Sequence, residues 1–156
     1  MVLKKQFALL SILLLALASC DEAKEKMTTI TAAPDASEIL KTDADFSDMS
    51  RQLGMRKAFL QYMAKEGILL RPDNPPIIGA DAIDYLSQVN DSGYVLTWKP
   101  LNGDIAKSGE LGYTYGVYEL ALQDTIIKGT YVNVWHKQPN GEWKFVIDSG
   151  NQGLSE

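Results

Sequence analysis

The stretch GTYVNVWHKQPNGEWKFVID, residues 129–148, decides the fold class because it has the pattern of a β-hairpin. Runs rich in aromatic and β-branched residues lie on both sides of Pro139-Asn140-Gly141, and Asn-Gly between two such runs is the strongest short hairpin signal. The pattern therefore predicts two antiparallel strands over residues 126–137 and 143–148.

Two more strand patterns precede this hairpin. Residues 94–106 and 111–122 are rich in strand-forming residues, and the polar segments between the runs predict turns. Pro100 and Asn102-Gly103 predict a bulge or an exposed edge in the first of these strands. We therefore expect four strands in an antiparallel meander.

The segment before the strands has helical periodicity. Phe46, Met49 and Leu53 recur at helical spacing, with Asp43 or Asp45 available as a cap. The segments expected after this helix are a second helical stripe to about residue 65, a strand over residues 68–70, a proline-rich loop over residues 71–76 and a helix from Gly79. Helices followed by a meander predict an α+β fold.

Five segments of the chain carry a resemblance to a known family: RKAF at 56–59, PIIGADAI at 76–83, SGELGYTYG at 108–116, GTYVNVW at 129–135 and GEWK at 141–144. Over about residues 43–151 the chain resembles SnoaL-like domains of the nuclear transport factor 2-like superfamily, which includes ketosteroid isomerase. The resemblance implies a cone-shaped roll, in which a curved antiparallel sheet of four to six strands wraps around N-terminal helices and leaves a pocket at the open end. The chain is most similar to the branch of unassigned function, and fold does not imply function, so no catalytic residues are carried over.

The first twenty residues have the layout of a bacterial lipoprotein signal peptide. Two lysines precede an apolar run over residues 7–17, and Leu17-Ala18-Ser19-Cys20 resembles a lipobox. The run is too short for a transmembrane helix, which needs about 20 apolar residues, whereas ordinary secretion with cleavage after Ala18 stays open. The resemblance implies a lipid on Cys20 and anchoring to a membrane of the bacterial cell envelope, facing the periplasm or the cell exterior.

This layout divides the chain into four segments. They are a signal peptide over residues 1–19, a tether over residues 20–42, a folded domain over residues 43–151 and a tail over residues 152–156. The tether is expected to be flexible because it is rich in alanine, threonine and charged residues and contains no aromatic residue.

Charge and cysteine usage exclude several function classes. The net charge of −5 becomes −7 without residues 1–19, which contain two lysines, and an acidic domain repels phosphate backbones, so no nucleic-acid partner is expected. Cys20 is the only cysteine, which excludes a disulfide or a thiolate nucleophile in the folded domain. The sequence has no glycine-rich phosphate loop and no paired histidines, so we expect neither a cofactor nor a metal.

Asp148 is the best candidate for general acid–base chemistry because it ends the last strand after three apolar residues. A carboxyl group in an apolar cavity has a raised pKa and can move protons at a carbon acid. The segment Asp148-Ser149-Gly150-Asn151 also has the composition of a strand-terminating turn, so that interpretation stays open. Acyl transfer is not expected, because the only histidine, His136, lies at a strand end.

Aromatic side chains on the strands are candidates for a ligand pocket. Tyr113 and Tyr115 share one face of their strand, and Tyr131, Asn133 and Trp135 share one face of the next. The candidate pocket residues are these five together with Trp98 and Tyr62. Such a set can line a site for a flat or apolar ligand, or it can fill the core or a dimer face.

Two functions follow from these features. The first is a lipid-anchored module that binds a small apolar or aromatic molecule or a protein partner. The second is an isomerase or dehydratase that transfers protons without a cofactor. A cavity that ends at an ionisable group would support a small-molecule site, whereas a filled cone would not. A homodimer formed through the sheets is compatible with either function.

Overall fold

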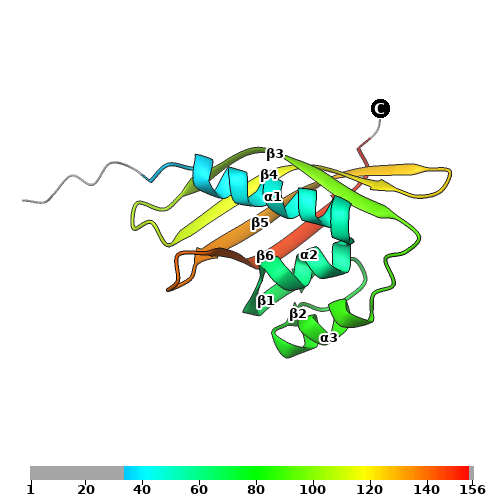
Figure 1. Ribbon diagram of the computed structural model, residues 1–156, viewed down its shortest axis with the longest axis horizontal. Coiled ribbons are helices and arrows are strands. Elements are labelled where there is room, and N and C mark those ends of the chain that lie inside the picture. Colours follow the sequence, from blue (N-terminus) through cyan, green and yellow to red (C-terminus); the bar gives the residue numbers. More distant parts are fainter. Residues whose placement is uncertain (1–33, 155–156) are drawn as a thin grey trace, which may run out of the picture. The chain divides into compact units, whose positions relative to one another are not determined.

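The structure, a computed structural model, describes residues 34–154. In chain order its elements are α1 (Ser37–Leu53), α2 (Met55–Tyr62), β1 (Met63–Leu70), β2 (Ile77–Ile78), α3 (Ala80–Gln88), β3 (Val95–Ile105), β4 (Leu111–Ala121), β5 (Ile126–Lys137) and β6 (Trp143–Gln152), labelled in Figure 1. Cys20, the proposed signal peptide and most of the expected tether lie outside the described residues. Between residues 34 and 154, no helix is both long enough and apolar enough to cross a membrane.

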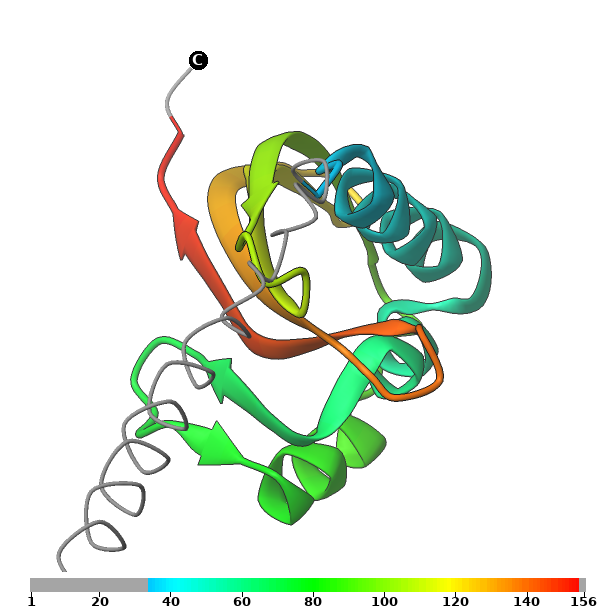
Figure 2. The same ribbon diagram turned by 90° about the vertical axis from the view of Figure 1, so that its left-hand side faces the viewer.

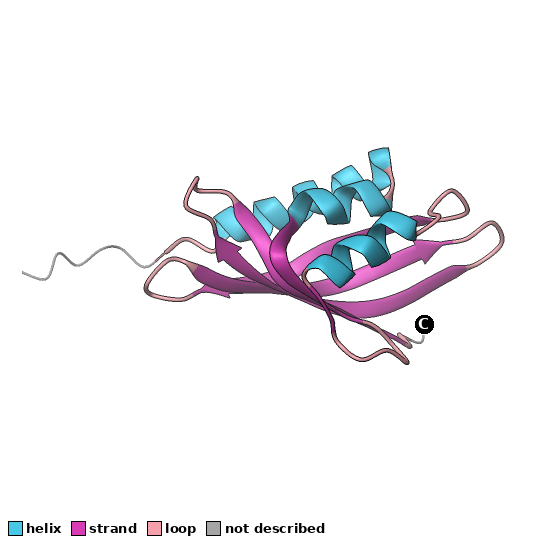
Figure 3. Ribbon diagram, turned by 90° about the horizontal axis from the view of Figure 1, so that it is seen from below, coloured by secondary structure: helices cyan, strands magenta, loops and turns pink. Residues whose placement is uncertain are grey.

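Six strands of the described part form one curved sheet in the order β2-β1-β6-β5-β4-β3. The strands β3 to β6 form an antiparallel meander, whereas β1 lies parallel to β6 and pairs with β2 on its other side. Figure 2 shows the curvature of the sheet, and Figure 3 shows helices along one face, which we call the inner face. The predicted α+β cone is confirmed, and the parallel β1–β6 pair is its departure from a wholly antiparallel sheet.

The first helix starts earlier than the sequence pattern predicted. It begins at Ser37 after the N-cap residue Ala36, and the backbone N–H of Ser37 donates to the carboxylate of Asp35 (2.9 Å), whereas Asp43 and Asp45, expected as caps, lie inside the helix. Ile39 is fully buried, and it extends the buried stripe of α1 upstream of the expected boundary at residue 43. The folded part therefore includes residues that the sequence analysis assigned to the tether.

The second helix ends earlier than predicted. It stops at Tyr62, and β1 begins at Met63, although the apolar stripe predicted a helix to about residue 65. Met63 pairs with Phe145 of β6, so strand pairing with a distant part of the chain overrides the local periodicity.

Phe46 lies at the centre of an aromatic core between α1 and the sheet. The rings whose centroids lie 4.5–6.2 Å from its own are those of Phe59, Tyr62, Trp98, Trp135 and Phe145. Edge-to-face and stacked pairs of this kind contribute about 0.5–1.5 kcal/mol each beyond the burial of their area. This core fixes the helices over the inner face.

Candidate functional site

A cavity of about 350 Å³ lies between α2, the loop after β1 and the strands β3 to β6. Its volume lies within the range of about 300–1,000 Å³ that is typical of small-molecule sites. The residues that line it are Met55, Phe59, Arg71, Pro72, Tyr94, Leu96, Trp98, Tyr118, Leu120, Tyr131, Asn133, Asp148, Ser149, Gly150 and Gln152. Most of them are apolar or aromatic, so the polar groups of the cavity are few and defined.

Two glycines allow tyrosine rings of the wall to lie directly against the sheet. A Cβ atom at Gly129 would lie 2.5 Å from Cε1 of Tyr118, and one at Gly116 would lie 2.9 Å from Cε1 of Tyr131. Any side chain at these positions would displace the rings and would also meet a backbone carbonyl oxygen of a neighbouring strand, which lies even closer. Gly116 and Gly129 therefore set the depth at which the two tyrosines sit in the wall.

The charged groups of the cavity are Arg71 and Asp148, which form an ion pair. Arg71 Nη2 lies 2.6 Å from Asp148 Oδ1, and the side chains of Arg71 and Asp148 are 22% and 10% exposed. Arg71 also donates to the carbonyl of Leu70 (3.1 Å) and lies over the ring of Phe59. Burial raises the pKa of Asp148, while the Arg71 guanidinium acts to lower it. Asp148 is therefore easier to protonate than an exposed aspartate.

A second buried carboxylate, Asp43 on α1, lies behind the wall of the cavity. It accepts hydrogen bonds from the Tyr131 hydroxyl (2.7 Å), the Trp98 indole N–H (2.8 Å) and the Asn133 amide (3.3 Å). All three donors line the cavity, and Asp43 itself is fully buried. Burial raises the pKa of Asp43, and the hydrogen bonds from these donors and from Thr114 act to lower it. A single carboxylate thus orients three residues of the wall.

Asn133, which lines the cavity, carries a buried acceptor without a donor. The residue is 1% exposed, and its Oδ1 has no hydrogen-bond partner among residues 34–154. Its orientation follows from Asp43, because the amide N–H₂ and not the carbonyl oxygen must face a carboxylate. Tyr131 stays a neutral hydroxyl, because burial and the neighbouring Asp43 raise its pKa. A buried acceptor without a donor costs about 1–3 kcal/mol, so a ligand donor that reaches it would relieve this cost.

The structure brings together four of the residues singled out in the sequence. Asp148, Trp98, Tyr131 and Asn133 all line the cavity. The strand register explains part of this arrangement, since Asn133 of β5 is the direct neighbour of Asp148 on β6. The carboxyl group considered for proton transfer therefore lies at an apolar cavity, as that hypothesis requires.

The other aromatic candidates lie elsewhere, which corrects the expectation of one pocket cluster. Trp135 is fully buried and donates to the hydroxyl of Thr114 (2.8 Å), so it belongs to the core. Tyr62 stacks on Phe46 and is absent from the cavity wall.

Tyr113 and Tyr115 lie on the outer face of the sheet. They pair with Val134 and Val132, whereas Thr114 between them pairs with Asn133, so alternation along β4 points the tyrosines away from the cavity. The two rings stack on each other and are 46% and 44% exposed. Pairing of two chains through this outer face stays a prediction.

Two residues of the site were missed in the sequence. The proline-rich segment 71–76 predicts only a surface loop for Arg71, and the sequence pattern around Asp43 predicts only a helix cap. A signal for Asp43 exists, because Ile39, Asp43 and Phe46 recur at helical spacing and place a carboxylate in the buried stripe. For the part of the chain that the structure describes, no group of three His, Cys, Asp or Glu side chains could hold a metal ion.

Comparisons with known proteins identify the fold. No protein-family model and no curated protein matches the sequence. The chain is similar to the crystal structure of a ketosteroid isomerase-like protein from Erwinia carotovora atroseptica, with a TM-score of 0.60, 11% identity, and coverage of 76% of this chain and 96% of that chain.

Two further solved structures support the same assignment. A nuclear transport factor 2-like protein of unknown function from Shewanella oneidensis has a TM-score of 0.57, 12% identity, and coverage of 73% of this chain and 97% of that chain. A nuclear transport factor 2-like protein with a cystatin-like fold from Novosphingobium aromaticivorans has a TM-score of 0.58, 13% identity, and coverage of 74% of this chain and 80% of that chain. At these identities the similarity concerns the fold alone, which is that of nuclear transport factor 2-like and ketosteroid isomerase-like proteins.

Proposed function

We propose that this protein is a lipid-anchored SnoaL-like binding module of the bacterial cell envelope, and that its cavity holds a small, uncharged, largely apolar ligand with a hydroxyl or amide group. The observation that carries the proposal is a largely apolar cavity of about 350 Å³ that is also lined by Arg71, Asp148 and Asn133. The anchor rests on the sequence around Cys20, which lies outside the described residues.

The charge of the cavity favours an uncharged ligand. Arg71 and Asp148 neutralise each other at 2.6 Å, so a charged ligand would have to separate the pair or be buried without a counter-ion. A hydroxyl or amide group can instead donate to Asp148 or Asn133 and accept from Arg71. The rings of Trp98, Tyr118 and Tyr131 supply the apolar surface for the remainder of the ligand.

A matched ligand pair tests this assignment. Calorimetric titration of the chain from Asp21 onward, which contains the compact unit 33–156, would use β-naphthol and its methyl ether. The two compounds share their apolar rings, and only the first can donate a hydrogen bond. We expect β-naphthol to bind about tenfold more tightly, which corresponds to about 1.4 kcal/mol and to one hydrogen bond. Equal affinities for the two compounds would contradict a site that recognises a hydrogen-bond donor on its ligand.

A variant that fills the cavity separates binding in the cavity from binding elsewhere. Gly150 lines the cavity, and a Cβ atom there would make only ordinary contacts, the closest at 3.5 Å from Tyr118, so Gly150→Leu should fold and occupy the space. The control is Gly93→Leu, because a side chain at this exposed loop position meets nothing within 4 Å. Binding should be lost in Gly150→Leu alone.

The second candidate function is proton transfer, which the raised pKa of Asp148 favours. In that reaction the ionised carboxylate would take a proton from a carbon next to a carbonyl group, and Arg71 would stabilise the negative charge formed on the carbonyl oxygen. Deuterium exchange of β-tetralone in D₂O, followed by NMR, tests this function. Exchange that Asp148→Asn abolishes would establish it, and exchange equal to that in buffer would leave binding as the function of the cavity.

A further inference from the structure

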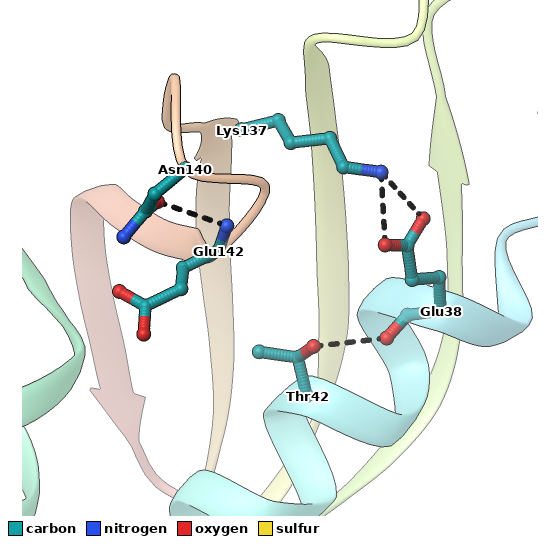
Figure 4. Close-up of polar contacts among 5 residues, drawn as sticks. All are labelled: Glu38, Thr42, Lys137, Asn140 and Glu142. Atoms are coloured by element: carbon teal, nitrogen blue, oxygen red, sulfur yellow. Dashed lines mark hydrogen bonds and ion pairs between the residues drawn. The ribbon is translucent and has the colours of Figure 1, made fainter.

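A polar groove of about 250 Å³ lies between the first half of α1, the end of α2 and the β5–β6 hairpin. Its α1 residues are Glu38, Thr42 and Asp45, and Tyr62 and Glu142 are among those that face them. It shares no lining residue with the apolar cavity. Figure 4 shows the two sides of this region, with Glu38 and Thr42 on α1 and Asn140 and Glu142 at the hairpin.

Trp143 lines this groove, and its buried indole N–H is a hydrogen-bond donor that has no acceptor among the described residues. The residue is 4% exposed, and its indole Nε1 has no partner within the described range 34–154. Native proteins pair nearly all buried donors, because each unpaired one costs about 1–3 kcal/mol. A ligand that brings an acceptor to this N–H would remove that cost, provided that the groove floor opens slightly on binding.

The charges of the groove are balanced. The ion pairs around it are Lys137–Glu38 (2.9 Å), Lys144–Glu142 (3.4 Å) and Lys41–Asp45. Each carboxylate thus has its own ammonium group, so the groove attracts neither sign of charge strongly. An anion would meet three carboxylates, and a simple cation would leave the Trp143 N–H without an acceptor. The groups present suit an uncharged ligand that both donates and accepts hydrogen bonds.

The fold holds these groups in place before any ligand arrives. The carboxamide oxygen of Asn140 accepts from the backbone N–H of Glu142 (3.1 Å), which fixes the hairpin turn, as Figure 4 shows. Lys144 donates to the carbonyl of Gln61 (2.8 Å), which ties the hairpin to the end of α2. Groups that are already ordered lose little entropy on binding.

We propose that this groove binds a saccharide. Its hydroxyls would donate to the carboxylates of Glu38 and Glu142 and accept from the Trp143 N–H and Lys144, and its C–H groups would pack against the ring of Tyr62. A carboxylate has about four acceptor positions, so both glutamates keep free positions beside their lysines. The site is independent of the function proposed for the apolar cavity.

Indole N–H resonances of the full chain in detergent micelles test the proposal. The chain has three tryptophans, so NMR resolves the groove reporter, Trp143, from the cavity residue Trp98. The probes are methyl glucoside, N-acetylglucosamine and maltose, compared with glycine, acetate and methylammonium. We expect at least one saccharide to shift the Trp143 resonance saturably while the Trp98 resonance stays in place. A saturable shift only with the charged probes, a shift at Trp98 alone, or no shift with any saccharide would overturn the proposal.

A matched pair of exposed variants then locates the site. Glu142→Gln keeps the shape of the side chain and removes its charge, and we expect it to weaken saccharide binding about tenfold, as loss of one charged hydrogen bond does. Glu119→Gln on β4 removes an equally exposed carboxylate, paired with Lys128, that is not part of the groove. Equal affinities of the two variants would overturn the assignment.

Discussion

Removal of the Asp43 carboxylate tests whether this group holds three side chains of the cavity wall in place. In Asp43→Ala, the side chains of Tyr131, Trp98 and Asn133 lose their common acceptor. A buried donor left unpaired costs about 1–3 kcal/mol, and the three donors can partly pair with one another. We therefore expect the free energy of unfolding to fall by about 3–5 kcal/mol. For a domain of this size, that loss lowers Tm by on the order of 10–15 °C.

The isosteric variant Asp43→Asn separates charge from shape. It keeps one acceptor, and rotation of neighbouring hydroxyl and amide groups restores part of the network, so we expect a loss of about 1–2 kcal/mol at pH 7. This loss should grow on acidification. The raised pKa of Asp43 means that the folded state binds a proton more tightly than the unfolded state, so the wild type gains stability as the pH falls from 7 towards about 4, and the variant lacks this gain.

Urea denaturation followed by far-ultraviolet circular dichroism at several pH values measures both effects. Asp84→Asn, at an exposed position of α3, serves as the control for a charge change without burial. Asp148 contributes equally to the pH dependence of stability in the wild type and in the variant, so its contribution cancels in their difference. A loss below about 1 kcal/mol in Asp43→Ala would refute the assignment of Asp43 as the shared acceptor. A loss in Asp43→Asn that shrinks as the pH falls would refute the sign of its pKa shift.

Three further predictions concern the core, the outer face and the anchor. Phe46→Ala should cost about 3–5 kcal/mol in the same denaturation experiment, because the ring lies at the centre of the aromatic core, and a loss of under about 1 kcal/mol would contradict that placement. Tyr115→Ser should cost less than about 1 kcal/mol, because its ring is 44% exposed on the outer face; a larger loss would mean that this face is covered. Cys20→Ser should move the protein from the membrane to the soluble fraction on centrifugation, and a variant that still sediments with membranes would rule out the lipid anchor.

Features that depend on neighbouring residues could be predicted from the sequence. The hairpin turn at Asn140-Gly141 follows from local chemistry, and Gly141 has the positive φ of 87° that favours glycine. The apolar residues before Asp148 predicted its place at an apolar cavity, but the expected strand end and turn at residues 148–151 are wrong, because β6 continues through Asp148 to Gln152.

Features that depend on distant pairing could not be predicted in this way. Met63 pairs with Phe145, 82 positions later, and nothing in the local pattern of residues 63–65 distinguishes a strand from a continued helix. Alternation places Tyr113 and Tyr115 on one face of β4, but only the register with β5 shows that this face is opposite to that of Tyr131.

The last strand of the sheet is not at its edge. β6 lies between β1 and β5, so the β1–β2 pair and the β3–β5 meander are not joined into one sheet until residues 143–152 are available. Contacts that join the beginning of a domain to its end are slow to form. The sheet therefore cannot be completed before residues 143–152 are free to pair with β1 on one side and β5 on the other.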